Sequence, residues 1–474
     1  MISESLLKEL KHIVGPGGFL VGGDIAQRYY EDLMGARADK PAILLRPSTT
    51  EQVSRIMAAC HREGQAVAPQ GGMTGLVSAA APCAGEVALS LERMRQVVEV
   101  DRFSGTITVE AGVPLQVIQE QAAAHDLLFP LDLGARGSCT IGGNLATNAG
   151  GNRVIRYGMT RELVLGVEAV LADGTVISSL NKLRKNNTGY DLKQLFIGSE
   201  GTLGIITRAV LRLMPRPTSQ VVALCALDDF FAVAEFLLHC QRQLAGNLTA
   251  FEVLWRNSYE LIITHIPGIP APLPASWPFY VLVESMGASA QRDRDLFEDT
   301  LAAAGEAGLV REVILADSEK QIAGLWRIRD AAAEVSSGVG YMHTYDISIK
   351  VGDMGYFGEE VVKRLRQRWP GAVIGLFGHI GDGNLHIVIH VGPDTRLQHL
   401  AVDEIIYGLV QELQGSVSAE HGIGLMKKPF LGHSRSPAEI ALMQSLKQAM
   451  DPRGILNPGR VINPRPDDAN FQNQ

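Results

Sequence analysis

Three glycine-rich stretches in the first half of the chain constrain its fold most strongly. They cover residues 70–75, 137–151 and 198–204, and the second is the most glycine-dense part of the protein. Glycine lets backbone N–H groups turn towards a phosphate and approach it closely. Neither of the first two stretches is a Walker motif or a Gly-x-Gly-x-x-Gly between a strand and a helix. They favour a large dinucleotide held by several loops, with tight turns as the alternative.

Hydrophobic periodicity predicts alternating strands and helices on both sides of a central boundary. Before the boundary, residues 42–45 and 106–111 are expected to be strands and residues 52–63 a helix. Pro215 and Pro217 then interrupt the pattern. A second series begins at residue 220 and includes a predicted helix over residues 318–335. The alternation indicates an α/β or α+β architecture with a domain boundary near residue 217.

Composition excludes several classes of protein. The 474 residues carry a net charge of -8 and no basic block, which argues against nucleic-acid binding. Without a signal peptide or a bilayer-length apolar run, the chain is expected in the cytoplasm, with peripheral membrane contact left open. The five cysteines form no Cys-x-x-Cys pair, as is usual in a reducing compartment. They are Cys60, Cys83, Cys139, Cys225 and Cys240.

Two histidines flank a short polar turn in the second half of the chain. His379 and His386 lie on either side of Gly-Asp-Gly, between apolar runs that predict a β-hairpin. Glu420 and His421 follow a later apolar run. A single histidine in an apolar strand is more often a core or surface residue than a ligand. Together, however, His379, His386 and Glu420 match the ligand set of an open site for Zn²⁺, Mn²⁺, Fe²⁺ or Co²⁺, with Zn²⁺ preferred.

These motifs, taken in order, resemble the flavoproteins of the vanillyl-alcohol-oxidase type. The resemblance to their FAD-binding domain is carried by residues 69–75, 137–151, 157–158 and 198–204. Residues 378–386 and 420–424 resemble the metal-containing D-2-hydroxyacid dehydrogenase branch, which oxidises D-lactate, D-2-hydroxyglutarate or glycolate. Residues 183–195 are most similar to the D-2-hydroxyglutarate dehydrogenases.

The resemblance implies an α+β fold with three parts. Residues 1–217 would form a two-part FAD-binding domain. Residues 218–435 would form an α/β substrate (cap) domain with an antiparallel sheet that carries the metal and the base. Residues 436–474 would return to the FAD domain.

The same resemblance implies which residues bind FAD. The pyrophosphate would lie against the first loop, the isoalloxazine and ribityl groups against the second, and the adenosine against the third. No histidine occurs between Gln65 and Arg95, so FAD is expected to be non-covalent. The residues assigned to FAD are Pro69, Gln70, Gly71, Gly72, Met73, Thr74, Gly75, Gly137, Ser138, Gly142, Asn144, Thr147, Asn148, Gly151, Glu200, Gly201 and Ile205.

A metal with open positions can bind the hydroxyl and carboxylate of a 2-hydroxy acid and lower the hydroxyl pKa. His421 is the candidate base for the hydroxyl proton, while hydride leaves Cα for flavin N5. Two alternatives remain: a metal-independent flavoprotein oxidase, and the flavin subunit of a larger complex. The electron acceptor is left open between a quinone, an electron-transfer flavoprotein and oxygen, and a homodimer is left open as well.

The substrate anchors predicted by the resemblance are less regular. The family's carboxylate-binding arginine matches Arg329, on a predicted helix, and Asn384 in the turn is assigned to substrate or to orienting a ligand histidine. D-2-hydroxyglutarate enzymes tend to carry lysine near Thr344 and asparagine at Val388. Counting by two along the strand, Lys350 could replace that lysine. These departures move the expectation towards D-lactate or another short 2-hydroxy acid.

Overall fold

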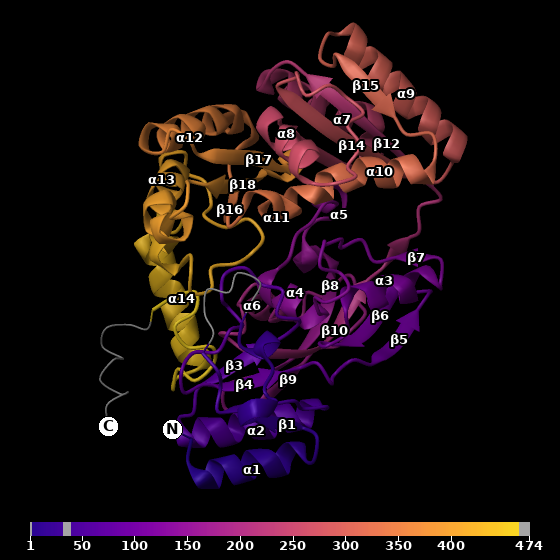
Figure 1. The fold of residues 1–474 in the computed structure, drawn as a ribbon. Helices are drawn as coiled ribbons and strands as arrows, with labels where there is room; N and C mark the ends of the chain where they lie inside the picture. The colour runs from indigo at the N-terminus through magenta and orange to yellow at the C-terminus, as the bar shows by residue number, and fades with distance from the viewer. Residues whose placement is uncertain (1, 32–38, 464–474) are drawn as a thin grey trace. The chain divides into compact units, whose positions relative to one another are not determined.

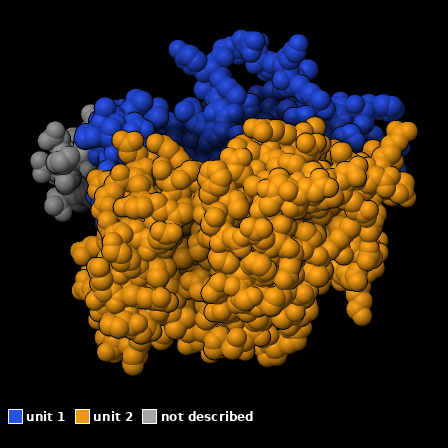
Figure 2. Space-filling view, turned by 90° about the horizontal axis from the view of Figure 1, so that it is seen from above, with its two compact units in different colours: residues 1–149, 159–216, 420–474 blue, residues 150–158, 217–419 orange. Residues whose placement is uncertain are grey.

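The computed structural model describes residues 2–31 and 39–463, drawn as a ribbon in Figure 1. The chain divides into two compact units, coloured separately in Figure 2. Unit 1 comprises residues 1–149, 159–216 and 420–474, and unit 2 comprises residues 150–158 and 217–419. The boundaries proposed from sequence, after residues 217 and 435, stay a prediction.

The N-terminal part of unit 1 is a four-stranded sheet packed against two helices (Figure 1). Its strand order is β1 (Phe19–Val21), β2 (Ile43–Leu45), β4 (Val87–Ser90), β3 (Val67–Gln70). The helices are α1 (Glu4–Val14) and α2 (Thr50–Glu63). Helix α2 begins where the Thr49 side chain accepts a hydrogen bond from the Gln52 N–H, and ends at Gly64, whose φ is 69°. The predicted helix 52–63 is thus present, starting two residues earlier.

The second sheet of unit 1 is antiparallel and five-stranded. Its order is β5 (Val97–Asp101), β6 (Thr106–Glu110), β10 (Ile205–Arg212), β8 (Val164–Val170), β9 (Val176–Ser178). A two-stranded ladder pairs β7 (Leu127–Leu128) with β11 (Met214–Pro215). The helices of this part are α3 (Leu115–Ala123), α4 (Ile141–Thr147) and α6 (Lys193–Phe196). One apolar core joins the helices to the sheet.

The C-terminal residues complete unit 1. Helix α14 (Pro437–Met450) starts with a capping box between Ser436 and Glu439. Beyond it, Leu456 forms a parallel bridge to Val67 of β3. The guanidinium of Arg460 is fully buried and donates to the carboxylate of Glu86. The tail is therefore part of the unit that carries the glycine loops.

Unit 2 is built on a seven-stranded antiparallel sheet. Its order is β15 (Glu312–Leu315), β12 (Ser219–Leu227), β14 (Phe279–Gly287), β13 (Leu248–Trp255), β17 (Val373–His379), β18 (Asn384–His390), β16 (His343–Ser348). Its helices are α5 (Val154–Tyr157), α7 (Phe230–Leu244), α8 (Arg256–His265), α9 (Ala290–Glu306), α10 (Glu319–Asp330), α11 (Ser336–Val339), α12 (Met354–Arg368) and α13 (His399–Glu412). The expected helix 318–335 is shorter, because the chain tightens into a 3-10 turn at Ala331–Glu334.

Among residues 2–31 and 39–463, no helix is both long and apolar enough to span a bilayer.

Candidate functional site

The histidine hairpin predicted from sequence is present in unit 2. Strands β17 and β18 pair antiparallel, with Phe377 opposite His386. A 3-10 turn over Ile380–Asp382 joins them, followed by Gly383 at a φ of 87°, a conformation that favours glycine. The rings of His379 and His386 lie 5.3 Å apart between centroids and nearly perpendicular. The turn thus holds two imidazoles side by side.

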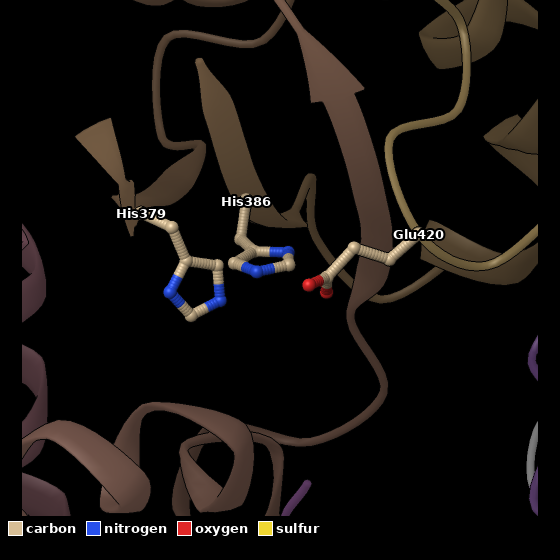
Figure 3. A group of neighbouring side chains, drawn as sticks. All are labelled: His379, His386 and Glu420. Carbon is tan, nitrogen blue, oxygen red and sulfur yellow. The ribbon is translucent and has the colours of Figure 1, made fainter. Parts of the chain in front are cut away.

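Glu420 follows directly on Ala419, the last residue of unit 2. One ligand atom from each of His379, His386 and Glu420 lies within 4.8 Å of the other two. Figure 3 shows the two rings and the carboxylate side by side. A second group of this kind contains Asp346, Glu420 and His421. Two imidazoles and a carboxylate fit an open divalent-metal site.

Glu252, a carboxylate that the sequence analysis did not identify, is hydrogen-bonded to His379. Glu252, on β13, is opposite His379 in the strand register and only 2% exposed. Its Oε1 lies 2.5 Å from His379 Nδ1, and its Oε2 accepts a 2.7 Å bond from Arg329 Nε. Burial acts to raise the pKa of Glu252, but its interactions with His379 and Arg329 outweigh the burial and lower this pKa. A lone glutamate in the apolar run 248–255 was the available sequence signal.

The two arginines of α10 differ in their surroundings. Arg329 has a largely buried side chain, and its Nη2 lies 2.9 Å from His379 Nε2. Arg327 is 42% exposed and pairs with Glu334 instead. Of the two arginines of α10, Arg329, which the sequence predicted as the substrate anchor, therefore lies beside a histidine of the hairpin, whereas Arg327 pairs with Glu334.

The other predicted substrate residues lie around the same strands. Asn384 donates from Nδ2 to Asp346 Oδ1 at 2.7 Å, and its buried Oδ1 has no hydrogen-bond partner. Thr344 is exposed and opposite Val388 in the β16–β18 register. Lys350 is exposed and lies beyond the end of β16 at Ser348, so counting by two does not extend to it. Burial raises the pKa of Asp382, in the turn, to about 6.

In unit 1, the first two glycine loops touch through their backbones. A Cβ on Gly72 would lie 2.1 Å from the carbonyl oxygen of Ser138, so only glycine allows this approach. Gln70 ends β3, and its Nε2 donates to the carbonyls of Tyr29 and Ala80. Gly71, Met73, Thr74 and Gly75 continue this loop, and Gly137 precedes Ser138 in the second one. The structure thus brings two separate predicted cofactor loops together.

Three polar side-chain atoms on and beside these loops are buried without a partner. They are Oε1 of Gln70, Oγ1 of Thr140 and Oδ1 of Asn144. Buried polar groups in proteins are normally hydrogen-bonded, so these atoms are open to the polar groups of a ligand. The ribityl hydroxyls, the isoalloxazine edge and the phosphates of FAD are polar groups that fit these donors and acceptors. The loops therefore fit a bound dinucleotide.

The remaining predicted cofactor residues support the local backbone. Gly142 and Asn144 lie in α4, and Thr147 Oγ1 donates to the carbonyl of Gly143 within it. Asn148 ends the helix in the left-handed region and accepts the Arg161 N–H through Oδ1. Gly151 belongs to unit 2.

The Glu200 side chain was assigned to FAD, but in the structure it binds backbone N–H groups of the protein. Its carboxylate is buried and accepts the backbone N–H groups of Ile423 and Gly424 at 2.7 and 2.8 Å. Burial raises the pKa of this carboxyl. The neighbouring Gly201 lies against Pro69, and the Ile205 side chain packs in the core of unit 1. Contact with a cofactor would thus fall to the backbone of this loop.

The C-terminal tail adds a residue that the sequence reasoning missed. Asn457, 2% exposed, donates from Nδ2 to the carbonyls of Glu200 and Ala79, while its Oδ1 is buried without a partner. It therefore joins the third glycine loop to the segment that follows the first one. The available sequence signal was the turn-forming Asn-Pro-Gly at residues 457–459.

Comparisons with known proteins identify a family for each of two parts of the chain. A family described as "FAD binding domain" matches residues 41–179, and one described as "FAD linked oxidases, C-terminal domain" matches residues 216–461. The chain is 41% identical to the mitochondrial D-2-hydroxyglutarate dehydrogenase of Rattus norvegicus, covering 97% of this chain and 85% of the relative. It is 37% identical to the D-2-hydroxyglutarate dehydrogenase of Stutzerimonas stutzeri, covering 98% and 100%.

Further relatives extend the range of named substrates and show the fold. A putative mitochondrial D-lactate dehydrogenase of Schizosaccharomyces pombe is 38% identical, with 97% of this chain and 90% of the relative covered. The solved structure of 4-ethylphenol oxidase from Gulosibacter chungangensis superposes with a TM-score of 0.78 at 18% identity, covering 98% of each chain. That of p-cresol methylhydroxylase gives 0.76 at 17%, again covering 98% of each.

Proposed function

Since this chain belongs to the FAD-linked D-2-hydroxyacid dehydrogenases of the vanillyl-alcohol-oxidase type, we propose that it uses a divalent metal ion to oxidise a short D-2-hydroxy acid to the 2-oxo acid. The family, the α+β fold with its antiparallel sheet, and FAD as cofactor confirm the sequence-based predictions. The metal, the roles of the site residues and the exact substrate form the proposal.

The observation that carries the metal is the grouping of His379, His386 and Glu420, whose ligand atoms lie within 4.8 Å of one another. A divalent ion bound there would supply a Lewis acid for the hydroxyl and carboxylate of the substrate. Zn²⁺ suits two imidazoles and a carboxylate, and Mn²⁺, Fe²⁺ and Co²⁺ are the alternatives. The rings reach the ion from one rigid hairpin, which reduces the entropy lost on binding.

The proposed roles of the other residues follow from their chemistry. His421 takes the proton of the substrate hydroxyl, because a neutral imidazole is a base near neutral pH. Arg329 binds the substrate carboxylate, for which its planar fork of N–H donors is suited. Asn384 has a buried, partnerless Oδ1 that suits a substrate hydroxyl. Bound FAD supplies the hydride acceptor, and its non-covalent attachment is part of the proposal.

Two observations bear on the substrate, and they favour different acids. The relatives named D-2-hydroxyglutarate dehydrogenase favour a dicarboxylate. Thr344 and Val388 stand opposite each other on β16 and β18 and offer neither a positive charge nor an amide for a second carboxylate. Lys350, beyond β16, is the remaining cation considered for that task. We favour D-lactate or a similar short acid, with D-2-hydroxyglutarate as the second candidate.

Anaerobic reduction of the bound flavin tests this choice. D-lactate, L-lactate, D-2-hydroxyglutarate, D-malate and glycolate are mixed separately with the purified protein, and bleaching of the flavin band is followed. We expect D-lactate to bleach it fastest. Faster bleaching by D-2-hydroxyglutarate would favour the second candidate, and bleaching by L-isomers alone would overturn the stereochemistry.

Chelation separates the proposal from a metal-independent oxidase on the same fold. Metal-stripped protein that keeps its flavin should lose activity and regain it with Zn²⁺. Full activity after stripping would favour the metal-independent alternative. Activity of the isolated chain with an artificial dye would rule out a role limited to a flavin subunit. The natural electron acceptor, a homodimer and the cellular location stay predictions.

A further inference from the structure

We infer that Glu252 is a positioning residue that fixes His379 as a metal ligand and Arg329 as a carboxylate binder at the same time. This inference rests on the proposed function and adds a residue that it did not use. Glu252, His379 and Arg329 all belong to unit 2.

The hydrogen bonds around His379 define which ring nitrogen carries the proton. Nδ1 lies 2.5 Å from Oε1 of Glu252, an acceptor when ionised. Nε2 lies 2.9 Å from Nη2 of Arg329, and a guanidinium can only donate. Both neighbours are satisfied by one neutral tautomer, with the proton on Nδ1 and the lone pair on Nε2. That tautomer presents Nε2 to a metal ion.

Glu252 orients the arginine with its second oxygen. Oε2 accepts from Nε of Arg329 at 2.7 Å, so the carboxylate holds the inner edge of the guanidinium. Nη2 is thereby directed at Nε2 of His379. When Nε2 serves as a ligand, Nη2 gives up this bond, and the substrate carboxylate is then its natural partner. One buried carboxylate would thus couple the metal ligand to the substrate anchor.

The strand register explains why these two contacts persist. Glu252 on β13 faces His379 on β17 directly in the antiparallel pair. Both residues are almost completely buried, with Glu252 2% and His379 4% exposed. A buried carboxylate without cationic or N–H partners would be costly, so the sheet, the histidine and the arginine stabilise one arrangement.

The neighbouring strand offers a matched control. Glu284 on β14 is also a fully buried carboxylate, and it accepts from Thr249, Gln220 and Trp326. It forms an ion pair with Arg153 rather than with Arg329. A role limited to holding the sheet together would be shared by both glutamates, whereas a role at the site would belong to Glu252 alone.

The test compares Glu252→Gln with Glu284→Gln in the full chain. We measure Zn²⁺ affinity by competition with a chromogenic chelator, melting temperature, flavin content, and kcat and KM with D-lactate. For Glu252→Gln we expect Zn²⁺ affinity to fall about 10- to 100-fold and KM to rise, with flavin content unchanged. For Glu284→Gln we expect a lower melting temperature with Zn²⁺ affinity unchanged. Wild-type affinity in Glu252→Gln, or an equal loss in both variants, would overturn the inference.

A second measurement needs no change at Glu252. In ¹⁵N-histidine-labelled wild-type protein stripped of metal, the ring signals of His379, assigned by their loss in His379→Gln, should show a proton on Nδ1. A proton on Nε2 would overturn the inference even if Glu252→Gln does not fold. Failure of the proposed function appears differently: wild-type protein would then bind no Zn²⁺, while the tautomer of His379 still reports on Glu252.

Discussion

Glu200 in unit 1 and Glu252 in unit 2 are both buried carboxylates, but their partners differ. Glu200 accepts two neutral backbone N–H groups, and burial raises its pKa. Glu252 touches a histidine and an arginine, and its interactions with these two partners lower its pKa despite the burial. The Glu200 carboxylate fastens one loop to another, whereas the Glu252 carboxylate is hydrogen-bonded to two ionisable side chains.

The same contrast runs through the two regions. Around the glycine loops, the geometry is made by backbone, as in the contact of Gly72 with Ser138, and polar side-chain atoms are left for a ligand. Around the histidine hairpin, the geometry is made by side chains on paired strands. We conclude that the region of the glycine loops depends on the conformations that its backbone can adopt, and the region of the histidine hairpin depends on the ionisable side chains that its strands carry.

The largest test of this contrast removes a proposed metal ligand. His386→Ala should lower kcat/KM by about 10³-fold or more, because the metal and the substrate lose their fixed position. Flavin content should be unchanged, since the cofactor loops do not depend on this side chain. The matched control is His390→Ala on the same strand, whose Nδ1 contacts the Tyr341 carbonyl. Equal losses in the two variants would contradict a special role for His386.

The next largest effect is expected on KM, from lysine substitutions at the two arginines of α10, Arg327 and Arg329. Arg329→Lys keeps the charge but loses the planar fork, so KM should rise about 10- to 100-fold. Arg327→Lys, with its exposed pair to Glu334, should leave KM within about twofold of wild type. Steady-state kinetics with D-lactate measures both. A similar rise in both variants would remove Arg329 from the proposed site.

Two glycine-to-alanine variants test whether FAD binding depends on the close backbone contact between the glycine loops. Gly72→Ala places a Cβ against the Ser138 carbonyl, so the loops must move apart; we expect loss of bound FAD and about 1–3 kcal/mol of stability. Gly23→Ala, outside the glycine loops and with no atom within 4 Å of the added carbon, should retain FAD. Flavin absorbance per chain and urea unfolding report the result. Retained FAD in Gly72→Ala would show that the loops are looser than this contact implies.

The smallest expected effect is on the pH dependence of stability, to which Glu200 and Glu252 should contribute with opposite signs. The raised pKa of Glu200 means that its contribution to folding falls as pH rises above its ordinary value of 4.5, by up to about 1.4 kcal/mol per pH unit. The lowered pKa of Glu252 means that its contribution is present above 4.5 and is lost as pH falls below it. Urea unfolding of wild type, Glu200→Gln and Glu252→Gln across this range should reveal opposite trends; parallel trends would refute the comparison.

Sequence patterns predicted some of these features better than others. The hairpin carrying His379 and His386 followed from local alternation and a Gly-Asp-Gly turn, which the chain specifies within a few residues. The start of the helix expected at 318–335 agrees with the N-cap of α10 at Ser318, but its C-terminal end does not agree, because the chain tightens into a 3-10 turn at Ala331–Glu334. Glu252 was missed because its importance arises from a strand partner 127 residues away.

The bond between Arg460 and Glu86 spans 374 residues and lies wholly within unit 1. A ribosome synthesises the chain in order, so Glu86 emerges long before its partner. Until residues near 456–460 have been made, β3 also lacks its bridge to Leu456. Unit 1 therefore cannot complete its fold during most of its own translation, whereas the seven-stranded sheet of unit 2 has all its strands by residue 390. A nascent chain should accordingly gain protease resistance in unit 2 before unit 1.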